Sequence, residues 1–204
     1  MSDCCNNDPG LNALHARQRS TLWNVLAINA VMFIVLIGAS MYANSTALLS
    51  DSLDNLGDTL TYAISLYAVS RGSQIKARVA LFKGLLILTA SLFVAGHIIF
   101  RVFYPAVPIF EAIGAFSLIS LVANGICLGL LWRHRKEDIN MSSVWECSRN
   151  DITSNLAVFV AAVSIWATGS RWPDIIVAAA LTAFFMRSGC RIISAASAQM
   201  HAVT

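Results

Sequence analysis

Long apolar runs separated by short polar segments make up most of this chain. Six runs are each about 20 residues or more, the length that an α-helix needs to cross ~30 Å of hydrocarbon. They cover residues 21–44, 47–70, 78–102, 108–132, 143–168 and 173–195. The pattern predicts an all-α integral membrane bundle of six transmembrane helices over residues 21–195, with short tails at 1–20 and 196–204.

Composition supports a membrane protein. The 204 residues are 57% hydrophobic and only 12% charged, whereas soluble domains carry about 25% charged residues. The mean hydropathy is +0.66. A water-soluble core could not enclose this much apolar surface, so lipid is the expected solvent. The first apolar run is too long for the core of a cleavable signal peptide, and none is expected.

The basic residues predict the orientation in the membrane. Ten Lys and Arg residues fall on the side that carries both tails, whereas the opposite side holds only Arg101 and Arg171. Loops that stay in the cytoplasm carry an excess of Lys and Arg. Both termini are therefore expected to be cytoplasmic, in a multi-pass protein of the cell or inner membrane.

The second apolar run contains more acid than packing can explain. Asp54 and Asp58 are four residues apart and share one helical face, and Asp51 precedes Asp54 by three residues. Each ionised carboxylate in a membrane interior is costly, and like charges on adjacent turns repel each other. A bound divalent cation would remove both difficulties. Asp51 has two interpretations: it joins the cation shell, or it caps a helix end near the membrane edge.

The fifth apolar run offers a matching pair at the same spacing, Cys147 and Asp151. Three carboxylates and a thiolate can form the tetrahedral shell that Zn²⁺ prefers, and a thiolate favours Zn²⁺ or Cd²⁺ over Mg²⁺. A lone cysteine can also be a small buried apolar residue. The candidate metal ligands are Asp54, Asp58, Cys147 and Asp151, with Asp51 as a possible addition.

These two segments resemble a known family. Residues 45–58, STALLSDSLDNLGD, resemble the second helix of the cation diffusion facilitators, and residues 147–155, CSRNDITSN, resemble their fifth helix. The resemblance implies a homodimeric exporter of Zn²⁺ and related ions that exchanges metal for protons. It places the transport ligands at Asp54, Asp58, Cys147 and Asp151. Zinc-transporting members usually have His where this chain has Cys147, a change that favours softer ions such as Cd²⁺.

Most members of that family carry a cytoplasmic ferredoxin-like domain after the sixth helix. Only about ten residues follow the last apolar run here, so the resemblance points to a short form without that domain. A homodimer would then rest on the membrane helices alone. The adjacent Cys4 and Cys5 in the first tail have two interpretations, collection of soft metal at the entrance or no role.

The expected function is proton-coupled antiport of Zn²⁺ or Cd²⁺ by alternating access. The expected partners are divalent metal, protons, lipid and a second copy of the chain; no enzymatic activity, cofactor or nucleic acid is expected. One alternative is a non-transporting membrane sensor or partner that binds metal. Another is an intramembrane aspartyl protease, but Gly57-Asp58 matches only part of the Gly-x-Gly-Asp signature because residue 55 is Asn. No His-Glu-x-x-His motif of a zinc protease is present.

Overall fold

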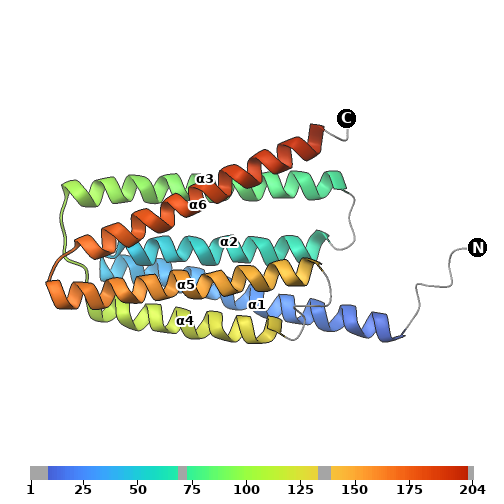
Figure 1. Ribbon diagram of the computed structural model, residues 1–204, viewed down its shortest axis with the longest axis horizontal. Coiled ribbons are helices and arrows are strands. Elements are labelled where there is room, and N and C mark those ends of the chain that lie inside the picture. The colour runs from blue at the N-terminus through green and yellow to red at the C-terminus, as the bar shows by residue number, and fades with distance from the viewer. Residues whose placement is uncertain (1–8, 69–72, 133–138, 202–204) are drawn as a thin grey trace, which may run out of the picture.

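The chain folds into six α-helices in the computed structural model shown in Figure 1, which describes residues 9–68, 73–132 and 139–201. The helices are α1 (Pro9–Ala43), α2 (Thr46–Ala68), α3 (Ser73–Phe103), α4 (Phe110–Trp132), α5 (Ile139–Thr168) and α6 (Trp172–His201). No strand occurs within these ranges, so the all-α prediction is confirmed. Cys4 and Cys5 lie outside the described residues.

Successive helices run in opposite directions, so α1 begins and α6 ends at the same end of the bundle (Figure 1). We call this the terminal end. The opposite end, called the far end, holds the three described connections, at residues 44–45, 104–109 and 169–171. Placement of the start of α1 and the end of α6 at one end agrees with an even number of spans. Which end faces the cytoplasm stays a prediction from the basic residues.

Two groups of helices make up the bundle. Helices α1, α2, α4 and α5 pack side by side, and α3 with α6 forms a closely packed pair that lies against α2 (Figure 1). Small residues allow the close approach within the pair. A Cβ atom added at Gly189 would lie 3.3 Å from the carbonyl oxygen of Gly84. Close backbone contact at small residues is a usual way for helices to associate in membranes.

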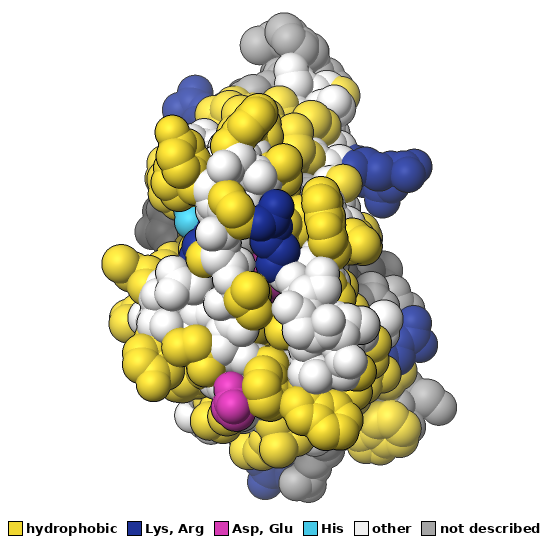
Figure 2. Space-filling view, turned by 90° about the vertical axis from the view of Figure 1, so that its left-hand side faces the viewer, with side chains coloured by type: hydrophobic (Ala, Val, Ile, Leu, Met, Phe, Trp, Pro, Cys, Tyr) yellow, Lys and Arg dark blue, Asp and Glu magenta, His cyan; other side chains and the backbone are white. Residues whose placement is uncertain are grey.

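Helix α2 is central, because it contacts each of the other five helices. Large exposed apolar side chains are frequent on the others, for example Phe82 on α3, Leu118 on α4 and Phe184 on α6. None belongs to α2 among the side chains that the structure describes. Hydrophobic side chains also dominate the far end, with few charged groups between them (Figure 2). Lipid-facing helices around a polar central helix are the arrangement expected of a membrane bundle.

Length and composition identify five membrane spans in the described residues, in α1 and α3 to α6. Helix α2 has 23 residues and is also long enough, but it carries three aspartates. The chain is therefore a multi-pass integral membrane protein. Several helices continue beyond their apolar runs; α1 begins at Pro9 rather than at residue 21. Hydropathy marks the lipid-facing part of a helix, whereas its backbone hydrogen bonds continue outside the hydrocarbon.

The start of α2 is anchored to α6. Asn44 adopts the left-handed backbone conformation that ends α1, with φ of 53°. Ser45 then caps α2, because its Oγ accepts a hydrogen bond from the Leu48 amide at 3.1 Å. The buried Asp174 of α6 accepts hydrogen bonds from the Ser45 hydroxyl and from the Thr46 amide, the latter at 2.7 Å. A negative charge at a helix N-terminus is favourable, so Asp174 holds α2 and α6 in register.

Candidate metal centre

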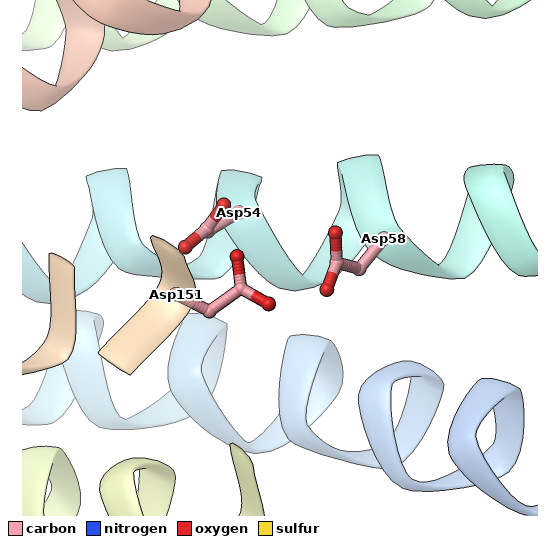
Figure 3. A group of neighbouring side chains, drawn as sticks. All are labelled: Asp54, Asp58 and Asp151. Carbon is pink, nitrogen blue, oxygen red and sulfur yellow. The ribbon is translucent and has the colours of Figure 1, made fainter. Parts of the chain in front are cut away.

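Three carboxyl groups meet in the interior of the bundle. Asp54 and Asp58 extend from consecutive turns of α2, and Asp151 extends toward them from α5 (Figure 3). One oxygen atom from each residue can be chosen so that the three lie within 4.8 Å of one another. Asp58 and Asp151 are 3% and 4% exposed, and Asp54 is partly buried with Oδ2 enclosed. The arrangement follows from the four-residue spacing on α2 and from the contact between α2 and α5.

Neighbouring side chains hold these carboxyl groups in place. The Tyr62 hydroxyl, fully buried one turn after Asp58, donates a hydrogen bond of 3.1 Å to its Oδ2. Ser154 of α5 lies beside Asp54. Asp58 and Asp151 lie beside each other, with an oxygen atom of each within 4.8 Å of the other. Such partners restrict the rotamers of a carboxyl group and so preorganise it for a ligand.

Electrostatic repulsion makes the ionised centre costly without a cation. At an effective dielectric constant of 20, two unit charges 4.8 Å apart repel by about 3.5 kcal/mol. Protonation or a bound cation can relieve this repulsion. A divalent cation within the three oxygens would interact favourably with each carboxylate, and carboxylate oxygens are ligands for Zn²⁺ as well as for harder ions. The geometry can therefore hold either protons or a metal ion.

The structure brings together three of the predicted ligands, Asp54, Asp58 and Asp151. Asp51 lies outside this group, although it is fully buried on the same helix. Cys147 lies on α5, one turn closer to the terminal end than Asp151, and its side chain is outside the described residues. Its role as a ligand stays a prediction from the spacing.

Two residues that support the centre were missed in the sequence. Tyr62 continues the spacing of Asp54 and Asp58 by another turn, so the periodicity of α2 could have pointed to it. Asp174 follows Trp172-Pro173 in the first turn of α6, where an acid is ordinary. No local signal shows that it caps α2 rather than its own helix.

A carboxylate centre inside a polytopic helical bundle is typical of membrane proteins that move cations or protons. Residues 22–200 match the cation efflux transmembrane domain, which is most of the chain. The chain belongs to the cation efflux family, and is accordingly a transporter of divalent cations. No curated protein matches the sequence significantly.

Proposed function

We propose that this protein exports Zn²⁺ or Cd²⁺ by exchange for protons, with Asp54, Asp58, Asp151 and Cys147 as the metal ligands. The observation that carries the proposal is the convergence of three carboxyl groups from α2 and α5, with oxygens within 4.8 Å of one another. A structural role for this acid cluster is disfavoured because its members repel one another. Cation efflux proteins transport divalent cations, the class to which Zn²⁺ and Cd²⁺ belong.

Cys147 supplies the preference for soft ions in this proposal. It precedes Asp151 by four residues on α5, so both lie on one face of the helix. A thiolate beside three carboxylates gives four ligands, the usual number for Zn²⁺. Sulfur favours Zn²⁺ and Cd²⁺, whereas Mg²⁺ and Ca²⁺ prefer shells made of oxygen alone.

Proton exchange follows from the chemistry of these ligands. Carboxylates and thiolates bind metal only when deprotonated, so metal binding releases protons. In the metal-free protein, protons would relieve the repulsion between the carboxyl groups, as the close contact of Asp58 with Asp151 allows. Metal and protons therefore compete for the same atoms, which couples their movements in opposite directions.

The helix arrangement is suited to alternating access. The centre lies between α2 and α5, and α2 also contacts the α3–α6 pair, so a movement of that pair acts directly on a helix that carries two of the ligands. A rocking movement of one group against the other would open the centre first to one end and then to the other.

We place the terminal end in the cytoplasm, in the cell or inner membrane, on the distribution of basic residues. The exposed apolar faces of the helices would carry a homodimer.

The proposal is tested in proteoliposomes that contain the purified protein and an imposed pH gradient. Metal-sensitive and pH-sensitive dyes would follow both ions at once. The proposal predicts Zn²⁺ or Cd²⁺ movement that accelerates with the proton gradient and is accompanied by opposite proton movement. Asp54→Asn should abolish both signals. Glu111→Gln, which removes an exposed acid at the start of α4, should leave both unchanged.

Metal movement without proton movement would contradict antiport while preserving metal transport. Equal fluxes in the wild type and in Asp54→Asn would contradict the site. Metal binding without flux of either ion would instead identify a sensor.

A further inference from the structure

Three buried side chains near the metal centre carry oxygen atoms that have no hydrogen-bond partner. Both carboxylate oxygens of Asp51 are unpartnered, as are Ser120 Oγ and Asn155 Oδ1. All three residues are 0% exposed. Buried polar atoms in folded proteins are nearly always hydrogen-bonded, because leaving one without a partner costs about 1–3 kcal/mol. Such atoms are therefore available to bind a ligand or water.

The helix directions place these groups on one side of the metal centre. Helix α2 runs from the far end to the terminal end, so Asp51 lies closer to the far end than Asp54. Helix α5 runs the opposite way, so Asn155 lies closer to the far end than Asp151. Because Asp54 and Asp151 meet, this antiparallel register sets Asp51 and Asn155 at about the same level, roughly one helical turn from the centre. Ser120 of α4 lies beside the Asp51 side chain.

The chemistry of this group fits a cation. The Asn155 side-chain amide donates to the Asp151 carbonyl oxygen at 2.9 Å, so its own carbonyl oxygen is the group left without a partner. Asn55 is arranged in the same way, with its amide on the Asp51 carbonyl oxygen at 3.2 Å and its Oδ1 unpartnered. A carboxylate, amide carbonyls and a hydroxyl are oxygen ligands of the kind that divalent cations bind. An anion would be repelled by the Asp51 carboxylate.

We propose that Asp51, Ser120 and Asn155 form a second cation position, about one turn toward the far end from the transport centre, which a divalent cation occupies as it leaves. This inference rests on the proposed transport function. The position contains only oxygen ligands, so it holds Zn²⁺ and Cd²⁺ less firmly than a centre that includes a thiolate. Weaker binding at a second position lets an ion leave a tight site in steps, because passage requires binding that is favourable but not too strong.

Equilibrium binding of Mn²⁺ tests the position without relying on transport. The background is the full chain with Asp54→Asn and Asp151→Asn, which disables the transport centre, in lipid nanodiscs. Mn²⁺ suits oxygen ligands, and its bound fraction is measured by electron paramagnetic resonance. One Mn²⁺ per chain is expected to bind. Asp51→Asn or Ser120→Ala in this background should weaken its affinity by about tenfold or more, and Glu111→Gln should not.

The absence of Mn²⁺ binding, or affinities that Asp51→Asn and Ser120→Ala leave unchanged, would overturn the second position. Water alone would then fill the space. Ser120→Ala is the milder change and serves where the Asp51 variant fails to fold, as judged by its helical circular dichroism.

Flux measurements with an otherwise wild-type chain separate this inference from the proposed function. Asp51→Asn should lower the maximal Cd²⁺ flux by about tenfold while leaving the equilibrium Kd for Cd²⁺ unchanged, and Asp51→Glu should restore part of the flux. A matching loss of Cd²⁺ affinity would instead make Asp51 a ligand of the transport centre and overturn the second position. Unchanged flux would also overturn it. Absence of flux in the wild type would overturn the proposed function and leave the Mn²⁺ result to stand by itself.

Discussion

Neutralising Asp151 should change the stability of the protein in opposite directions with and without metal. In the metal-free protein, Asp151→Asn removes a charge that faces Asp54 and Asp58 within 4.8 Å. Each fully ionised pair at that distance would cost about 3.5 kcal/mol at an effective dielectric constant of 20, so two pairs would cost about 7 kcal/mol. The metal-free wild type can avoid part of this repulsion by proton uptake. At neutral pH, Asp151→Asn should therefore raise the free energy of unfolding by only about 1 to 4 kcal/mol.

With metal present the same substitution should be harmful. The amide is a weaker ligand than a carboxylate and carries no charge, so Cd²⁺ affinity should fall by at least about 100-fold, or about 2.7 kcal/mol. Because a ligand stabilises the folded state in proportion to its binding, the rise in Tm on Cd²⁺ addition should largely disappear. The assay is thermal unfolding of the purified protein in detergent, with a chelator or with excess Cd²⁺.

Asp174→Asn is the matched control. It makes the same chemical change at a buried aspartate, but Asp174 caps α2 through the Thr46 and Ala47 amides instead of facing other acids. Asp174→Asn weakens these charge-assisted hydrogen bonds, so it should destabilise the metal-free protein by about 1 kcal/mol. The rise in Tm on Cd²⁺ addition should stay intact. The reasoning is refuted if Asp151→Asn also destabilises the metal-free protein and keeps the full Cd²⁺ shift.

Three further substitutions test the surroundings of the centre and the packing of the bundle. Tyr62→Phe removes the hydrogen bond to Asp58 and should lower Cd²⁺ affinity by about tenfold with the fold intact, as isothermal titration would show; an unchanged Kd would mean that Tyr62 only packs. Gly84→Ala places a methyl group 2.8 Å from an isoleucine side chain of α6, so Tm should fall and the free energy of unfolding should decrease by about 1–3 kcal/mol. Gly96→Ala on the same helix meets no atom within 4 Å and should not destabilise the protein. Equal effects of the two substitutions would contradict close α3–α6 packing. Cys147→His should raise the ratio of Zn²⁺ to Cd²⁺ flux because imidazole is a harder ligand than a thiolate, and a constant ratio would exclude Cys147 as the selectivity element.

Much of the fold could be predicted from the sequence, because lipid imposes a simple rule on composition. Spans must be about 20 apolar residues long, and the turns between them are marked by residues such as Asn44 and Gly169, which both adopt positive φ. Helix limits were less predictable. Helix α1 begins at Pro9, well before its apolar run, because helix formation outside the membrane depends on backbone hydrogen bonds rather than on hydropathy.

The pairing of acids was predictable only in part. A four-residue spacing places Asp54 and Asp58 on one face in any α-helix, so that half of the centre follows from local geometry. Its meeting with Asp151 depends on how α2 packs against α5, and the structure brings oxygen atoms of the three residues within 4.8 Å of one another. Asp51 precedes Asp54 by three residues and lies outside the group. At about 1.5 Å of rise per residue, Asp51 is about 10.5 Å from Asp58 along the helix axis, so the two are far apart although they share a face.

Packing between distant segments accounts for what the sequence could not reveal. Ser45 and Asp174 are 129 residues apart, and their contact exists only because α6 returns to the start of α2. The close approach of Gly84 and Gly189 likewise needs the three-dimensional pairing of α3 with α6.

The most direct test of the central claim is the uptake of radiolabelled Cd²⁺ into proteoliposomes down its own concentration gradient. Wild type and Glu111→Gln should show saturable uptake, and Asp54→Asn, Asp58→Asn and Asp151→Asn should each reduce it to the level of protein-free liposomes. Saturable uptake that persists in all three variants would contradict a transport centre formed by these carboxylates.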